Sequence, residues 1–298
     1  MTAAIRDAVS EVTVLAGAID HPEAVAWWDG AVWCGTEAGD LVRIDSATGE
    51  TRVVARTGGF LLGLAFDGDG YCYGCDMGLG RVVRIGMDGS VEVLADSVAG
   101  RRLSSPNYLV FRSDGTLYVT ESGSGWEADD GYLFRIRPGH EPEVVSEECR
   151  AFPNGLALSA DQRTLYVVES RQPGVVTYEL DGDAVGPRQE FLHLPRTVPD
   201  GLALDSTGAL YVSCWRPDRV YRVAAGSDVA EIYLDDWTAE YLNSPTNLCF
   251  GGAGLSTIYL AGLCGYAISQ ISAEVPGQPL VFPSFRPALP PGLRAEEA

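Results

Sequence analysis

The apolar positions of this chain recur in a pattern that repeats six times. Each copy has an opening of six mostly apolar residues, a turn rich in Asp and Gly, and a second apolar run built around Tyr or Trp. We number the six positions of each opening as columns 1 to 6. The openings read PEAVAW at 22–27, LLGLAF at 61–66, PNYLVF at 106–111, PNGLAL at 153–158, PDGLAL at 199–204 and PTNLCF at 245–250.

The spacing of the copies indicates a propeller. Successive second columns lie 39, 45, 47, 46 and 46 residues apart, a period typical of a four-stranded propeller blade. In the third copy, residues 109–112, 117–120, 132–137 and 143–145 have strand patterns, and an Asp-Gly turn at 113–115 joins the first two. We therefore predict an all-β fold: a six-bladed β-propeller with four antiparallel strands per blade.

The whole chain, 1–298, is predicted to form one domain, with blades starting near residues 21, 60, 105, 152, 198 and 244. An open solenoid is the alternative, but it needs atypical capping repeats, and none is evident. Residues 12–15 resemble the outer strand at 91–94 and would close the last blade, while residues 279–282 are a second candidate for that place. The tail, 283–298, is expected to be irregular, either poorly ordered or lying flat on the surface.

The charge and the apolar runs of the chain indicate which kinds of molecule it binds. Acidic residues outnumber basic ones 41 to 21, giving a net charge of −20. This charge opposes binding to nucleic acid and to anionic membranes and favours a cation site. No apolar run approaches the roughly 20 residues that span a bilayer, and residues 1–7 lack the pattern of a secretory signal. We expect a cytoplasmic protein with a small-molecule partner, as a monomer or a homodimer.

The cysteines do not indicate a redox or zinc site. There are seven, an odd number, scattered over the repeats. Cys72 and Cys75 have the spacing of a metal or redox pair, but residues three apart in a strand point to opposite faces. No second pair follows at zinc spacing. The sequence therefore favours reduced cysteines packed in the core.

The second column carries the candidate chemistry. Two copies hold aliphatic or hydroxyl side chains there, Leu62 and Thr246, and the other four hold oxygen-rich ones: Glu23, Asn107, Asn154 and Asp200. We expect these residues to precede the innermost strands immediately and so to gather at one end of the central channel. Asn and Asp before Gly also form simple turns, but four of six at one repeat position favours a site. Such oxygen donors suit Ca²⁺.

A second, wider ring of residues is predicted at the same end of the channel. It is formed at the end of the second strand in five of the six copies and includes Glu121 and Ser170. The long insertion after Glu121, 122–130, is expected to overhang the channel with Trp126 as an apolar wall. His21 adjoins the ring, although a turn or packing role is favoured for it.

At these motifs the sequence resembles the regucalcin (senescence marker protein)/gluconolactonase family of six-bladed propellers. The resemblance covers residues 12–282 and is carried by HPE at 21–23, SSPN at 104–107, FPNGLA at 152–157, VPDGLA at 198–203 and PTNLCFGG at 245–252. It implies metal-dependent hydrolysis of lactones at one divalent ion. It also implies that Glu23, Asn154 and Asp200 are metal ligands and that Asp200 is the catalytic base. Asn107 is then a substrate contact in or beside the coordination shell.

The ion is expected to be Ca²⁺, with Zn²⁺, Mn²⁺ and Mg²⁺ as alternatives for the same donors. Substrate contacts are predicted for Asn107, Tyr108, Glu121 and Trp126.

Two positions depart from the family pattern. Family members commonly have Asp where this chain has Tyr108, and many have Arg where it has Ser105. An aromatic side chain in place of a carboxylate favours a lactone or ester more apolar than a sugar lactone. Two other functions stay open: a non-hydrolytic enzyme of the strictosidine synthase-like type, which uses no metal, and a calcium-binding propeller without catalysis.

Overall fold

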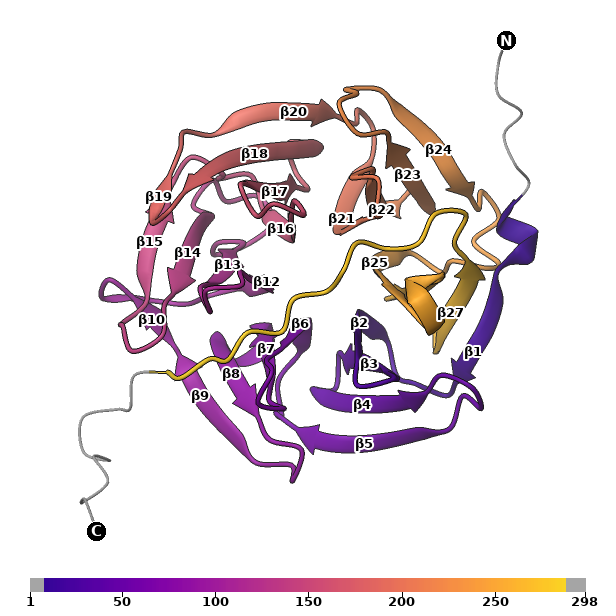
Figure 1. The fold of residues 1–298 in the computed structure, drawn as a ribbon, viewed down its shortest axis with the longest axis horizontal. Helices are drawn as coiled ribbons and strands as arrows, with labels where there is room; N and C mark the ends of the chain where they lie inside the picture. Colours follow the sequence, from indigo (N-terminus) through magenta and orange to yellow (C-terminus); the bar gives the residue numbers. More distant parts are fainter. Residues whose placement is uncertain (1–7, 288–298) are drawn as a thin grey trace.

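Six four-stranded antiparallel sheets stand around a central channel in the computed structural model (Figure 1). The structure describes residues 8–287. The segment 1–7, which bears on the secretory signal, and residues 288–298 of the tail lie outside the described part. The predicted six-bladed β-propeller with four antiparallel strands per blade is confirmed.

The first three blades follow the repeat without interruption, from the innermost strand outward. Blade 1 contains β2 (Pro22–Trp28), β3 (Ala31–Thr36), β4 (Asp40–Asp45) and β5 (Thr51–Arg56); blade 2 contains β6 (Leu61–Phe66), β7 (Cys72–Asp76), β8 (Arg81–Ile85) and β9 (Val91–Ala95); blade 3 contains β12 (Pro106–Phe111), β13 (Leu117–Glu121), β14 (Tyr132–Ile136) and β15 (Glu143–Ser146).

The last three blades carry the variations. Blade 4 contains β16 (Pro153–Leu158), β17 (Thr164–Glu169), β18 (Gly174–Asp181) and β20 (Gln189–His193), with the short β19 (Ala184–Val185) also paired to β18; blade 5 contains β21 (Val198–Leu204), β22 (Leu210–Arg216), β23 (Arg219–Val223) and β24 (Ala230–Asp235); blade 6 contains β25 (Pro245–Gly251), β26 (Thr257–Gly262), β27 (Ala267–Ser272) and β1 (Thr13–Gly17).

Few other elements occur in the described residues. A short ribbon of β10 (Ser97–Val98) and β11 (Arg101–Arg102) lies in the connection between blades 2 and 3. Three single 3₁₀ turns complete the list: η1 (Ala8–Glu11), η2 (Met77–Leu79) and η3 (Ala253–Leu255). Residues 8–287 contain no helix of the length and apolarity that a membrane crossing requires.

The inner strands are apolar on both faces because each sheet packs between two neighbours. The seam between blades 1 and 2 illustrates this packing. Phe66 on β6 stacks on Trp28 with ring centroids 4.9 Å apart, and its centroid lies 5.1 Å from that of Trp33. Equivalent buried clusters fill the other seams.

The N-terminal strand closes the ring. β1 pairs antiparallel with β27, with Thr13 opposite Gln270, so the first of the two candidate closing strands takes the outer place in blade 6. Residues 279–282 do not pair in that sheet. They belong to a C-terminal segment, 278–285, that crosses the channel and that we call the strap (yellow in Figure 1).

Backbone hydrogen bonds fasten the strap to the lower end of the channel, where the innermost strands finish. Gln278 N–H donates to the Leu204 carbonyl at 3.0 Å, and Gly68 N–H donates to the Pro283 carbonyl at 2.8 Å. The end of the channel that carries the second columns is thus the opposite, upper end.

The surface placement predicted for the tail is wrong at Phe285. Residues 283–287 are irregular, as expected, but Phe285 is only 1% exposed and lies between Tyr73 and Phe111, at 5.2 and 5.4 Å between ring centroids. An aromatic ring of this size gains more from burial in the gap between blades 2 and 3 than from contact with water.

Phe285→Ala should therefore lower the free energy of unfolding by about 3 kcal/mol or more, because it leaves a cavity where the strap is anchored. Phe282→Ala is the matched control: Phe282 is 40% exposed, so its loss should cost much less. Urea unfolding followed by tryptophan fluorescence measures both. Equal effects of the two variants would show that the anchor is not at Phe285.

Candidate active site

The four oxygen-bearing side chains of the second column come together as predicted at the upper end of the channel. They lie on β2, β12, β16 and β21 and are between 4% and 9% exposed: Glu23, Asn107, Asn154 and Asp200. We call them the polar ring. Since the four strands converge on one axis, residues between 46 and 177 positions apart in the sequence share one site.

In every blade a β-bulge changes the direction in which the second-column side chain points. The register between the two innermost strands shifts after column 1, so that the inner strand carries one extra residue. The second-column residues were expected just before the strands, and this expectation is wrong: pairing begins at column 1 and continues beyond the bulge. Bulges of this kind often direct side chains into active sites.

Two serines orient the asparagines of the ring. Asn107 Nδ2 donates to Ser122 Oγ at 3.0 Å, and Ser122 Oγ donates to the Pro153 carbonyl of the next blade at 2.7 Å. In the same way Asn154 Nδ2 donates to Ser170 Oγ at 3.2 Å, and Ser170 Oγ donates to the Pro199 carbonyl at 2.7 Å. Each serine thereby fixes which end of the amide is left to accept.

Sequence reasoning placed Ser170 in the wider ring but gave neither serine the role of orienting an asparagine. The signal that was available is the pair Glu-Ser after the second strand, at 121–122 and 169–170, in the two blades whose second column is Asn.

The side-chain oxygen of Asn154, one of the four ring residues, has no partner in the described structure. Asn154 Oδ1 is buried and accepts no hydrogen bond within the described structure. A buried amide oxygen without a donor costs roughly 1–3 kcal/mol. The ring therefore presents an acceptor that a bound cation or a water molecule would satisfy.

Burial makes negative charge unfavourable in the ring. It raises the pKa of Glu23 to about 8. It also raises the pKa of Asp200 well above its usual range; the charge of Glu23 adds to this effect, and a hydrogen bond from Asn154 partly offsets it. No Lys, Arg or His of residues 8–287 forms an ion pair with either carboxylate. Two such carboxylates beside an unpartnered amide oxygen fit a divalent cation.

The possible metal ligands of the polar ring are not a cluster of three or more charged side chains. The described part of the chain contains no group of three or more His, Cys, Asp or Glu side chains arranged to hold a metal. The ring supplies two carboxylates and neutral amide oxygens instead, which are hard donors suited to Ca²⁺ rather than to softer metals.

Glu121 is held by backbone amides. Its Oε1 accepts from the N–H groups of Ser104 at 3.1 Å, Ser105 at 2.6 Å and Gly123 at 3.4 Å. Asp76 and Glu169 bind the loops that lead into blades 2 and 4 in the same way, but each of them also pairs with an arginine. Glu121 Oε2 is buried without a partner, so only this oxygen is free for the predicted substrate contact.

Tyr108 reaches across the channel. It lies on β12 of blade 3, and its hydroxyl is 3.3 Å from Asn247 Oδ1 on β25 of blade 6, the opposite blade. Asn247 Oδ1 also accepts from Leu248 N–H at 2.8 Å. Tyr108 also lines an apolar cavity that lies in the channel below the ring, so it separates the ring from this cavity. The sequence predicted a substrate contact for Tyr108 but not this position across the channel. Asn247, in the third column, was missed by the sequence analysis.

The insertion after Glu121 is fastened to blade 4. Trp126 is 42% exposed and packs on Phe152, with ring centroids 4.9 Å apart. Arg150 Nε donates to the Asp129 carbonyl at 2.7 Å, and Arg171 pairs with the Asp129 carboxylate. The loop thus presents an exposed indole at the upper end of the channel.

The remaining candidates have structural contacts. Thr246 Oγ1 donates to the Glu23 carbonyl at 2.9 Å across the seam between blades 6 and 1, and Leu62 is buried. His21 Nδ1 lies 2.8 Å from Asp20 Oδ1, and its ring packs on Tyr266, in keeping with the turn or packing role favoured for it. All the cysteines among residues 8–287 are free thiols, and five of the seven are buried.

Comparison with known proteins gives one family. The family profile described as SMP-30/Gluconolactonase/LRE-like region matches residues 21–262. A gluconolactonase of Zymomonas mobilis is 26% identical over 220 residues, which cover 67% of this chain and 60% of that protein. A pentonolactonase XacC of Haloferax volcanii is 28% identical over 257 residues, covering 82% and 79% respectively. The chain therefore spans less than two thirds of the Zymomonas mobilis relative.

Solved structures share the fold. A gluconolactonase from Xanthomonas campestris superposes with a TM-score of 0.76 at 22% identity, covering 89% of each chain. A calcium-binding protein, regucalcin, from Agrobacterium tumefaciens superposes with a TM-score of 0.74 at 16% identity, covering 92% of this chain and 96% of that one. At these identities the likeness concerns the propeller itself.

The burial of Glu121 predicts a pH dependence of stability. Burial raises its pKa from the usual 4.5 to about 7, against the effect of the three amide hydrogen bonds. The folded state then binds this proton more tightly than the unfolded state, so the carboxyl group lowers stability increasingly as the pH rises from about 4.5 to about 7.

Gln at position 121 does not titrate. The free energy of unfolding of Glu121→Gln, relative to wild type, should therefore increase across this pH range and level off above it. Urea unfolding at several pH values measures the difference, with Glu190→Gln, an exposed carboxylate on β20, as the matched control. A difference for Glu121→Gln that does not change with pH would contradict the assignment.

Proposed function

Since the chain belongs to the SMP-30/gluconolactonase/LRE-like family, we propose that it is a lactonase that hydrolyses its substrate at the polar ring with the help of one divalent cation. The observation that carries this proposal is the pair of buried carboxylates, Glu23 and Asp200, beside the unpartnered Oδ1 of Asn154. The names of the gluconolactonase and pentonolactonase relatives support lactones as the substrate class.

Glu23, Asn154 and Asp200 would hold the cation. All three offer oxygen, which favours Ca²⁺, with Mg²⁺, Mn²⁺ and Zn²⁺ as alternatives. Burial, and to a lesser extent the charge of Glu23, raise the pKa of Asp200. A bound cation would offset both effects, so both carboxylates would be ionised in the loaded protein. When bound, such an ion polarises the lactone carbonyl and increases the acidity of water.

The residues of the ring divide the remaining work. Asp200 would take the proton from the attacking water and return it to the ring oxygen of the lactone as the carbon–oxygen bond breaks. Ser170 would keep Asn154 turned so that its oxygen, not its nitrogen, faces the cation. Asn107 and the free Oε2 of Glu121 would bind polar groups of the substrate.

The substrate is proposed to be less polar than a simple sugar lactone. Tyr108 occupies the position where the family commonly has a carboxylate, and its hydroxyl is already engaged with Asn247. Trp126, which is exposed and packs on Phe152, would add an aromatic wall for such a substrate. We further propose a cytoplasmic protein, monomeric or homodimeric, that binds neither nucleic acid nor membranes, in keeping with the net charge of −20.

A panel of sugar lactones and alkyl lactones, with and without chelator, tests the reaction. We expect turnover that is lost on chelation and restored by Ca²⁺, with alkyl lactones preferred. Asp200→Asn should lower kcat by about 10²-fold or more, whereas Asp228→Asn, an exposed carboxylate far from the ring, should have no effect. Turnover that survives chelation or Asp200→Asn would overturn the mechanism.

The other outcomes separate the alternatives. A bound cation without turnover of any lactone or ester would support a calcium-binding propeller, and the absence of any bound cation would support the strictosidine synthase-like type.

The serines provide a second, matched test of the ring. Ser170→Ala should weaken cation binding by about 10- to 100-fold, since partners that orient a ligand typically contribute this much. Ser122→Ala removes the same contact from Asn107, which is not proposed as a direct ligand, and should weaken cation binding much less. Calorimetric titration with Ca²⁺ measures both. A larger effect of Ser122→Ala would move the cation toward Asn107.

A further inference from the structure

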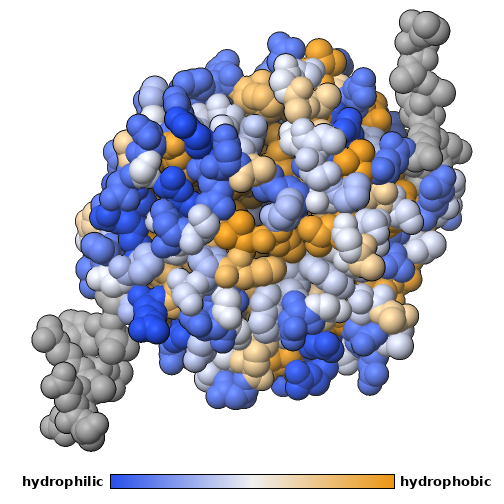
Figure 2. Space-filling model, in the orientation of Figure 1, coloured by the Kyte–Doolittle hydropathy of each residue, from blue (hydrophilic) through white to orange (hydrophobic). Residues whose placement is uncertain are grey.

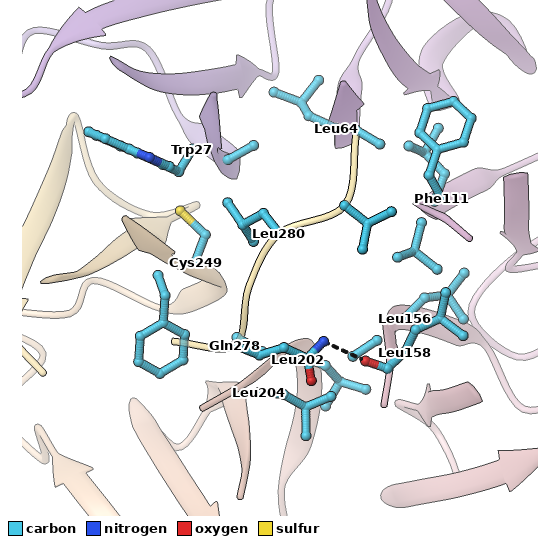
Figure 3. Close-up of a pocket in the computed structure, with 18 of the residues that line it drawn as sticks. Trp27, Leu64, Phe111, Leu156, Leu158, Leu202, Leu204, Cys249, Gln278 and Leu280 are labelled. Atoms are coloured by element: carbon cyan, nitrogen blue, oxygen red, sulfur yellow. Dashed lines mark hydrogen bonds between the residues drawn. The ribbon is translucent and has the colours of Figure 1, made fainter. Parts of the chain in front are cut away.

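An apolar cavity, partly open to solvent, lies in the channel between the polar ring and the strap (Figure 3). Its volume is about 340 Å³. Column 5 of the repeat explains the hollow, because all six copies carry a small side chain there, and all six residues line the cavity: Ala26, Ala65, Val110, Ala157, Ala203 and Cys249. The larger apolar side chains of columns 4 and 6 complete the wall, among them Leu156, Leu202 and Phe250.

The cavity is separate from the polar ring. Tyr108 borders it from above, where its bond to Asn247 spans the channel. The strap borders it from below through Pro279, Leu280, Val281 and Phe282. No charged side chain of the described residues lines it, so any ligand that it accepts must be neutral.

One polar group in the wall lacks a partner. Gln278 of the strap donates from Nε2 to the Leu158 carbonyl at 3.0 Å (Figure 3). Its Oε1 is buried and accepts no hydrogen bond in the described structure. The cavity therefore combines apolar walls with one unpartnered acceptor at its edge. Pockets of about 300 Å³ and above that combine apolar walls with a few polar groups are typical binding sites for small molecules.

We propose that this cavity binds a neutral, largely apolar small molecule that carries one N–H or O–H group, and that this group donates to Gln278 Oε1. Water is a poor occupant, because it needs two to four polar partners and apolar cavities of this kind stay dry or take up hydrocarbon. The site does not depend on the proposed lactonase reaction, since Tyr108 lies between the two.

The strap is the route by which a ligand would enter. Figure 2 shows an apolar band across the centre of the face that carries the strap, with a hollow beside it. Leu280 and Phe282 of the strap are 41% and 40% exposed, whereas Phe285 is buried. The crossing part of the strap thus has little packing of its own between its two anchors, so a small displacement would widen the opening of the cavity.

Two probes of the same shape test the proposal. Indole and benzofuran are fused bicycles that differ in having an N–H group or a ring oxygen. Calorimetric titration of the full chain should show indole binding about three- to tenfold more tightly than benzofuran, the difference expected for one hydrogen bond. Chelator should not change this result, because the cavity lies apart from the polar ring.

Variants locate the binding. Gln278→Met keeps the length of the side chain and removes the acceptor, so indole should bind no more tightly than benzofuran. Ala203→Phe fills the cavity and should abolish the binding of both probes. Ala65→Phe does the same from the opposite blade and replaces it if Ala203→Phe does not fold, as judged by thermal unfolding.

Three results would overturn the proposal: no binding of indole up to its solubility limit, equal affinities of the two probes for the wild type, or binding that persists in a folded cavity-filling variant.

Discussion

The pairing of β1 with β27 is the constraint on which the rest of this structure depends. It joins the two ends of the chain in one sheet and so turns six repeats into a closed ring. Closure places blade 6 against blade 1, where Thr246 Oγ1 holds the Glu23 carbonyl. Without closure, Glu23 in the first blade would not face Asp200 in the fifth, and the channel would not exist.

Closure also forces the same column of every repeat to the same height in the channel. The six inner strands run in one direction around one axis, each with a bulge after column 1. Column 2 therefore collects at the upper end, and column 5 lies further down. Variable, mostly oxygen-bearing residues in column 2 make the polar ring, and uniformly small residues in column 5 make a hollow.

The polar groups at the upper end of the channel lower the stability of the folded chain. Burial raises the pKa of Glu23 and Asp200, and the charge of Glu23 adds to the effect on Asp200. Within the described structure, the oxygens Asn154 Oδ1 and Glu121 Oε2 are buried without partners. Groups arranged in this way destabilise the folded chain unless a ligand satisfies them. The apolar side chains buried between neighbouring blades stabilise the fold and offset the cost of these polar groups.

The sequence alone determined the propeller, the number of blades and the residues of the polar ring, because a repeat of constant period leaves its apolar and polar columns visible in the chain. It also marked Tyr108 as a departure, though not its position across the channel. The closing strand, the serines behind Asn107 and Asn154, the bond between Tyr108 and Asn247, the burial of Phe285 and the cavity beneath the ring were decided by the tertiary structure. Each of these depends on contacts between blades or across the channel. The residues in contact are far apart in the chain, so no local sequence pattern predicts the contact.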